Sequence, residues 1–217
     1  MRIFLDTANI EEIKQAAKLG VISGITTNPS LISQAKATNY EAAIKEICSI
    51  IPGPVSTEVV VEGVPAMLKQ AREIAKWAKN VVIKVPATTE GLEVTATLAK
   101  EGIKVNFTLC FSVNQALLAA EAGATYVSPF VGRLDDIGQD GMLLVKDIVD
   151  IYKNYKEIKT EVIAASIRHP EHCVRAAKIG AHIATLPYKV LLQMIQHPLT
   201  DAGNKRFLAD FKSLIQQ

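Results

Sequence analysis

A lysine inside an apolar run is the residue whose chemistry is most readily inferred from this sequence. Lys84 stands in VVIKVP (81–86), which has the composition of a strand buried on both faces. Burial disfavours a charged ammonium group, and a neutral lysine amine can attack a carbonyl carbon to form a Schiff base. The alternative is a lysine that points outward between helices. Lys84 is therefore a candidate nucleophile whose role depends on its neighbours.

Two carboxylates are candidate acid–base partners for such a lysine. Asp6 lies in LDTAN (5–9) and Glu58 in STEV (56–59), each at the end of a short β-type run. Schiff-base chemistry needs groups that move protons on and off the carbinolamine and the substrate hydroxyls. Asp6 could instead cap the helix that follows it, and either carboxylate could be a structural ion-pair partner. Since strand interiors disfavour glutamate, Glu58 is the harder of the two to explain structurally.

Two arginines suggest that the substrate carries a phosphate. Arg133 in SPFVGR (128–133) and Arg168 in ASIR (165–168) follow predicted strands, and Ser166 stands beside the second. The guanidinium fork binds phosphate oxygens in a bidentate manner. Surface ion pairing is the alternative, because Asp135 and Asp136 closely follow Arg133.

The elements that must position these residues recur about every 25 residues along the chain. Each unit is a short apolar or β-branched run, a polar turn and an amphipathic helix, a pattern typical of βαβ units and a parallel sheet. The predicted strands are 2–7, 23–27, 55–60, 81–86, 104–109, 125–130, 161–166 and 182–187. Eight units in 217 residues predict one domain over 1–217, a single (β/α)₈ TIM barrel.

Polar side chains gather at the expected active end of this barrel. Side chains at i and i+2 share one face of a strand, and barrel chemistry takes place at the C-terminal ends of the strands. In seven of the eight strands we place a polar or charged residue there, in phase with the interior. These residues are Asp6, Thr26, Asn28, Ser56, Glu58, Lys84, Asn106, Thr108, Ser128, Ser166 and Arg168.

The predicted helices carry recognisable end signals. Asn9 with Glu12, and Ser112 with Gln115, have capping-box spacing, and Gly180 is one of four glycines expected just after a helix. Two further helices are predicted at 188–195 and 199–216, beyond the eighth strand. The second has an apolar face that must pack on its own barrel or on a neighbouring subunit.

Composition excludes several classes of function. The 24 Lys plus Arg and 22 Asp plus Glu residues give a formal net charge of +2, which disfavours a dedicated nucleic-acid or membrane-surface binder. Three separated cysteines and four histidines show no metal-ligand pattern, and no nucleotide-binding glycine motif is present. We expect no metal and no cofactor. The absence of a secretory or membrane-spanning segment leads us to expect a cytoplasmic protein.

Seven motifs together resemble the transaldolase family, and most resemble its short branch, which also contains fructose-6-phosphate aldolases. They are LDTAN (5–9), GITTNPSL (24–31), STEV (56–59), IKVPATTEGL (83–92), NFTLCFS (106–112), SPFVGR (128–133) and ASIR (165–168). The resemblance covers the whole length and falls on seven strand ends in order. It implies a lysine Schiff base that transfers a dihydroxyacetone unit from a ketose phosphate to an aldose phosphate, as in the pentose phosphate pathway.

The resemblance also implies a role for each site residue. Lys84 forms the Schiff base, Asp6 takes the proton of the C4 hydroxyl, and Glu58 and Thr108 hold the water used in imine formation and hydrolysis. Side chains that contact the dihydroxyacetone unit or shape its pocket are Asn28, Asn106, Thr26 and Ser128. The phosphate is expected at Arg133, Ser166 and Arg168.

Two positions bear on which activity of the branch to expect. The aldolase relatives typically carry Gln at the position of Glu58 and Tyr at the position of Phe130, so this chain matches transaldolase at both. Fructose-6-phosphate aldolase remains the main alternative. A second alternative is a non-catalytic phosphosugar-binding barrel. A third is another lysine-dependent aldolase, a class that usually carries its lysine on the sixth strand. The resemblance further implies a pentamer or decamer in which the 199–216 helix docks on a neighbour.

Overall fold

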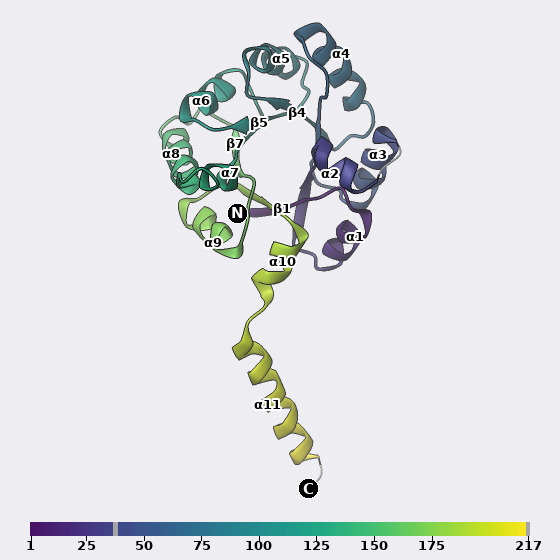
Figure 1. Ribbon diagram of the computed structural model, residues 1–217, viewed down its shortest axis with the longest axis vertical. Helices are drawn as coiled ribbons and strands as arrows, with labels where there is room; N and C mark the ends of the chain where they lie inside the picture. Colours follow the sequence, from purple (N-terminus) through teal and green to yellow (C-terminus); the bar gives the residue numbers. More distant parts are fainter. Residues whose placement is uncertain (37–38, 216–217) are drawn as a thin grey trace.

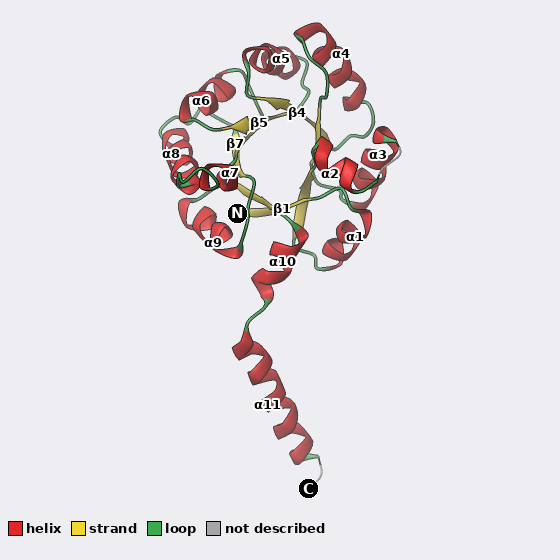
Figure 2. Ribbon diagram, viewed as in Figure 1, coloured by secondary structure: helices red, strands yellow, loops and turns green. Residues whose placement is uncertain are grey.

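Eight parallel strands close into a barrel in the computed structural model, which describes residues 1–36 and 39–215 (Figures 1 and 2). Each strand pairs with its sequence neighbours, and β1 pairs with β8. The strands are β1 (Arg2–Asp6), β2 (Ile22–Thr26), β3 (Val55–Glu58), β4 (Val81–Pro86), β5 (Val105–Cys110), β6 (Tyr126–Pro129), β7 (Glu161–Ala164) and β8 (Ile183–Leu186). The predicted (β/α)₈ barrel is confirmed, with strand ends within about two residues of those predicted.

Helices lie around the barrel in Figure 1, except the last one, which projects away from it. They are α1 (Ile10–Lys18), α2 (Pro29–Gln34), α3 (Tyr40–Ile50), α4 (Val64–Ala75), α5 (Thr89–Lys100), α6 (Val113–Glu121), α7 (Val131–Asp135), α8 (Gly141–Lys153), α9 (Pro170–Ile179), α10 (Tyr188–Ile195) and α11 (Pro198–Leu214). The short helices α2 and α7 were not predicted. Both follow directly after a strand end, at the face where the polar side chains gather.

The core has two parts, as strand alternation requires. One set of strand side chains packs outward against the helices. The other points into the barrel, where an interior cluster is formed by Phe4, Val82, Tyr126, Ile163 and Ile183. Two residues further along β1 and β4, the same inward phase reaches Asp6 and Lys84. The apolar cluster therefore lies inside the barrel directly below the polar side chains at the C-terminal strand ends.

The predicted helix ends are confirmed with one difference. Ser112 and Gln115 form a complete capping box at α6, and Gly180 ends α9 in the left-handed conformation with φ of 86°. Asn9 caps α1 by accepting from the amides of Glu11 and Glu12. The Glu12 carboxylate accepts a hydrogen bond from Thr7 instead of completing the box.

The last helix stands apart from the barrel. Helix α11 has no buried residue and projects away from the other elements (Figure 1). Of the predicted range 199–216, Gln216 lies outside the described residues. Along the described parts of the chain, no helix combines the length and the apolar character needed to cross a membrane.

Candidate active site

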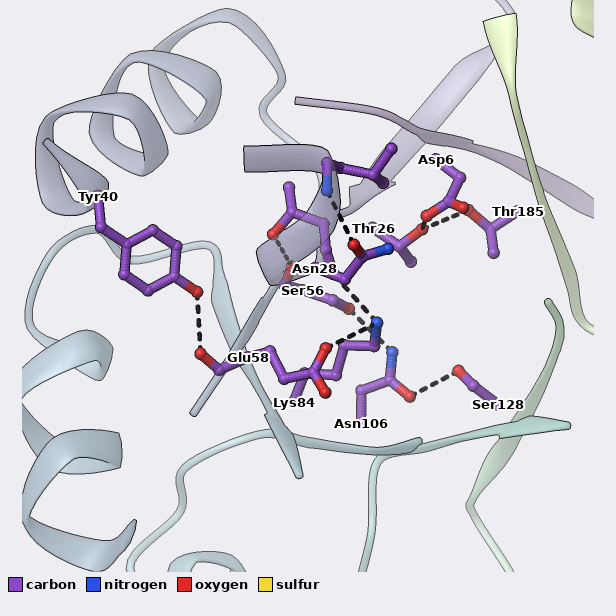
Figure 3. A network of polar contacts seen from close by, with 12 residues as sticks. Asp6, Thr26, Asn28, Tyr40, Ser56, Glu58, Lys84, Asn106, Ser128 and Thr185 are labelled. Atoms are coloured by element: carbon purple, nitrogen blue, oxygen red, sulfur yellow. Dashed lines mark hydrogen bonds and ion pairs between the residues drawn. The ribbon is translucent and has the colours of Figure 1, made fainter. Parts of the chain in front are cut away.

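Lys84 points into the barrel, so the outward orientation is wrong. Its residue is only 4% exposed, and its Cα is the register partner of Glu58 on one side and of Asn106 on the other. The Lys84 Nζ lies 3.3 Å from the Glu58 carboxylate and donates to the Thr27 carbonyl at 3.0 Å (Figure 3). The β3–β4–β5 register therefore places an amine, a carboxylate and an amide in one row.

Asp6 is buried in a short chain of hydroxyl groups. Thr26 donates to Asp6 at 2.6 Å, and the Thr185 hydroxyl lies 2.6 Å from that of Thr26 (Figure 3). Because the Thr26 hydrogen is directed at Asp6, Thr185 is the donor in the second contact. Burial raises the pKa of Asp6, and the charge of Lys84 and the hydrogen bond from Thr26 offset part of that rise. Asn9 caps α1, so the capping role considered for Asp6 is wrong.

A cavity of about 190 Å³ opens at this end of the barrel. It is lined by Asp6, Thr26, Asn28, Lys84, Ser128, Phe130, Arg133, Ala165, Ser166, Arg168 and Thr185. Nine of the twelve predicted site residues therefore line the cavity, whereas Glu58, Asn106 and Thr108 lie outside this lining. 

Side chains on β3, β5 and β6 form a second polar network beside the lysine. Asn106 donates to the Ser56 hydroxyl at 3.0 Å and accepts from Ser128 at 2.7 Å, so both ends of its amide are held (Figure 3). The buried Thr108 hydroxyl has no hydrogen-bond partner among the described residues. A hydroxyl in that state is available to a water molecule or a substrate.

Helix α2 begins at the cavity wall and fixes one of the predicted ligand groups. Asn28 is its N-cap, and its side-chain oxygen accepts from the Leu31 amide at 2.9 Å. This contact directs the oxygen at the helix and leaves the amide NH₂ group as the part that can donate to a ligand. Pro29, at the first helical position, fits the start of a helix because no amide hydrogen is needed there.

The predicted phase of Ser166 and Arg168 is wrong, although both residues reach the cavity. Ile163 points into the barrel, so simple alternation would direct Ala165 and Ile167 inward. Ser166 instead adopts a left-handed conformation with φ of 59°, and Ile167 packs in the outer core. The chain therefore turns at Ser166, and this turn brings Ser166 and Arg168 to the cavity.

The two arginines differ in their contacts. Arg168 donates to Asp136 at 2.7 Å in an exposed ion pair, as the surface alternative anticipated, and still lines the cavity. The Arg133 guanidinium lies over the Phe130 ring, 5.2 Å from its centroid. Phe130 thus orients a cation at the cavity wall. Two guanidinium groups on one side of the cavity can bind an anionic group.

Three contributors to the site were not predicted. Thr185 is in phase with the inward-pointing Ile183 on β8, so strand alternation could have identified it. The Thr27 carbonyl that binds Lys84 gives no signal in the sequence. Tyr40, on α3, donates to the Glu58 backbone carbonyl at 2.9 Å, and the sequence gives no signal for this contact either (Figure 3). Burial, aided by the charge of Glu58, raises the pKa of Tyr40, so this phenol stays protonated and remains a donor.

The remaining candidate groups take no part in this site. Cys48, Cys110 and Cys173 are buried free thiols, and burial raises the pKa of each to about 11. Over the described residues, no group of three or more His, Cys, Asp or Glu side chains is arranged to hold a metal ion. The chemistry that the geometry supports is covalent attack by a buried amine on a carbonyl compound that carries an anionic group.

Known proteins resemble this chain over nearly its whole length. The sequence model of the family described as Transaldolase/Fructose-6-phosphate aldolase matches residues 3–217. A protein of Dehalococcoides mccartyi named as a probable transaldolase is 64% identical over 215 residues, which cover 99% of each chain. A protein of the same name from Caldicellulosiruptor saccharolyticus is 59% identical, with 99% of this chain and 98% of the relative covered. Another from Methanococcus maripaludis is 56% identical and covers 98% of each.

Proposed function

The chain belongs to the transaldolase/fructose-6-phosphate aldolase family, and on that premise we propose that it transfers a dihydroxyacetone unit through a Schiff base on Lys84. The donor is sedoheptulose 7-phosphate or fructose 6-phosphate, and the acceptor is glyceraldehyde 3-phosphate or erythrose 4-phosphate. These are sugars of the pentose phosphate pathway.

The observation that carries the proposal is the position of the Lys84 amine. Its Nζ is buried at the cavity, 3.3 Å from a carboxylate that can accept its proton. A lysine kept only for stability would not need to line a cavity. Once deprotonated, the amine attacks the ketose C2 carbonyl to give a carbinolamine, and loss of water leaves the iminium ion.

Asp6 supplies the base for cleavage of the carbon–carbon bond. It takes the proton of the C4 hydroxyl, the C3–C4 bond breaks, and its electrons move to the iminium nitrogen as an enamine forms. The aldose phosphate leaves with the new carbonyl at C4. A pKa raised by burial suits this role, because a more basic carboxylate accepts the proton more readily.

Transfer completes the cycle. The enamine attacks the aldehyde carbon of the acceptor, Asp6 returns its proton to the new alkoxide, and water hydrolyses the iminium ion to release the product ketose. Glu58 and Thr108 are the groups proposed to hold that water, and the unpartnered Thr108 hydroxyl supports this assignment. Glu58, rather than Gln, and Phe130, rather than Tyr, favour transfer over simple cleavage.

The part of the cavity lined by residues after β6 and β7 is proposed to bind the phosphate. Arg133, Ser166 and Arg168 line it, and guanidinium groups bind phosphate oxygens with charge-assisted hydrogen bonds. Asn28, Asn106, Thr26 and Ser128 are proposed to contact or shape the dihydroxyacetone end. Their hydroxyl and amide groups match the hydroxyls of such a substrate.

Borohydride trapping tests the proposal directly. Fructose 6-phosphate followed by reduction should leave a dihydroxyacetone adduct that mass mapping assigns to Lys84. Lys84→Met should form no adduct, whereas Lys69→Met, which changes an exposed lysine of α4, should react like the unchanged protein. An adduct on another lysine, or none with the unchanged protein, would contradict the mechanism.

We also propose that the protein assembles as a pentamer or decamer in the cytoplasm. Helix α11 exposes Phe207, Phe211 and Leu214, with 70%, 60% and 70% of each residue accessible. A contiguous exposed apolar face of this kind commonly marks a surface that contacts a partner. A second copy of the chain is the proposed partner, and the three free thiols fit a reducing compartment.

A further inference from the structure

A buried histidine links the two segments that carry the cavity arginines. His172, on α9, has a side chain only 5% exposed. Its Nδ1 accepts a hydrogen bond from the Arg168 backbone amide at 3.3 Å. Its Nε2 lies 3.1 Å from the carboxylate of Asp135, the last residue of α7. One ring therefore spans the segment with Arg168 and the helix with Arg133.

The hydrogen bonds fix which nitrogen carries the proton. A backbone amide can only donate, so Nδ1 must be the unprotonated acceptor and Nε2 must carry the hydrogen that is donated to Asp135. The other oxygen of Asp135 accepts from the Gly141 amide at 3.0 Å, at the start of α8. The ring is thus held between two partners that themselves have fixed positions.

The segment that His172 holds needs external support. Ser166 is a non-glycine residue with φ of 59°, and such a conformation persists only where the surroundings impose it. One support is the Gly132 amide of α7, which donates to the Ser166 carbonyl at 3.0 Å. A Cβ at Gly132 would lie 2.3 Å from that carbonyl and 2.5 Å from the Arg168 side chain, so the approach requires glycine. The hydrogen bond from Arg168 to His172 is the second support.

We propose that His172 is a positioning residue that sets the spacing of Arg133 and Arg168 for the phosphate. This inference rests on the proposed function, in which those arginines bind the phosphate of the substrate. His172 does not line the cavity, so it acts only through the residues it holds. Its neutral ring suits the task, because a proton on Nδ1 would face the Arg168 amide and break the contact. Burial and the neighbouring His169 lower the pKa of His172, while Asp135 opposes that effect.

The test separates binding from chemistry. His172→Phe removes both nitrogens, and we expect the KM for fructose 6-phosphate to rise about tenfold with kcat within about twofold of the unchanged protein. His172→Asn keeps an acceptor near the Nδ1 position and should recover part of the loss. Trapping of unphosphorylated dihydroxyacetone on Lys84 should be unchanged, because this ligand does not use the arginines.

His182 provides a matched control. Its Nδ1 also accepts a backbone amide, that of Val162 at 3.0 Å, but at the opposite end of the barrel. His182→Phe should leave the KM for fructose 6-phosphate unchanged. A similar rise in KM for the two variants would overturn the proposal, because the effect would then be a general loss of stability.

A double-substitution cycle tests whether His172 acts through Arg168. Combined with Arg168→Ala, the substitution His172→Phe should raise KM by less than about twofold further. A full additional tenfold rise, or no rise from His172→Phe alone, would overturn the positioning role. If Arg168→Ala alone left KM unchanged, the phosphate role of Arg168 in the proposed function would fail instead. If His172→Phe forms no dihydroxyacetone adduct, the same KM measurements are made with His172→Gln, and the same results support or overturn the proposal.

Discussion

Lys84 and Glu58 are direct partners across β3 and β4, and their amine and carboxylate lie 3.3 Å apart inside the barrel. The β3–β4 register therefore supplies the lysine with an immediate proton acceptor. Folding removes both groups from water, and the Thr27 carbonyl accepts a further hydrogen bond from the amine. A buried pair of this kind is stable only while its remaining hydrogen bonds are satisfied.

Replacing the carboxylate should slow the proton transfers. Glu58→Gln keeps the shape of the side chain but removes its capacity as a base, so we expect transfer to fall by on the order of 10²-fold or more. Transfer from fructose 6-phosphate to erythrose 4-phosphate is the measurement. Glu62→Gln, at an exposed glutamate shortly after β3, is the control and should retain full activity. Unchanged transfer by Glu58→Gln would remove Glu58 from the mechanism.

Asp6→Asn should lower the activity and raise the stability of the fold. Burial raises the pKa of Asp6, so the folded protein binds this proton more tightly than the unfolded chain does. An acid with a raised pKa destabilises the fold increasingly as the pH rises from its unfolded pKa to its folded pKa, and the full penalty applies above the folded pKa, where the ionised form is buried. We expect Asp6→Asn to lose cleavage activity and to raise the melting temperature at pH 8.

The pH dependence provides the check on this prediction. The gain in melting temperature should shrink as the pH falls through the folded pKa of Asp6, since the unchanged protein then carries a neutral carboxyl group. Asp147→Asn, at an exposed aspartate of α8, should show no comparable gain. A lower melting temperature for Asp6→Asn at pH 8 would mean that lost contacts outweigh the relief of the buried charge.

The acceptor dependence of turnover should distinguish transfer from simple cleavage. With fructose 6-phosphate alone, we expect the enamine on Lys84 to persist and free dihydroxyacetone to appear slowly. Adding erythrose 4-phosphate should raise turnover greatly, as measured by formation of glyceraldehyde 3-phosphate and sedoheptulose 7-phosphate. Rapid release of dihydroxyacetone without an acceptor would favour fructose-6-phosphate aldolase as the function.

The α11 face should govern assembly. We expect the unchanged protein to have the mass of an oligomer at micromolar concentration. Replacing Phe207 and Phe211 together by Ser should yield smaller species, because the apolar area that drives docking is reduced. Lys205→Ser, on the same exposed helix, should leave the mass unchanged. A monomeric mass for the unchanged protein would contradict the proposed assembly.

The sequence by itself determined the barrel and most of its polar lining. A repeat of strand and helix signals leaves few topologies, and a side-chain period of two directs Asp6, Thr26 and Lys84 inward wherever their strands are regular. These properties are local, so they can be predicted without knowing which strands meet. The same reasoning would have included Thr185, which keeps the phase of Ile183.

Only the tertiary structure decided how these residues meet. Strand register sets Glu58 opposite Lys84, and no single strand contains that information. The inward-pointing Ile163 would direct Ala165 and Ile167 inward by alternation, but the left-handed Ser166 breaks the period of two and brings Arg168 to the cavity instead. Tyr40 contacts the backbone of Glu58, and His172 contacts the side chain of Asp135. Such contacts between residues distant in the sequence exist only after the helices have packed.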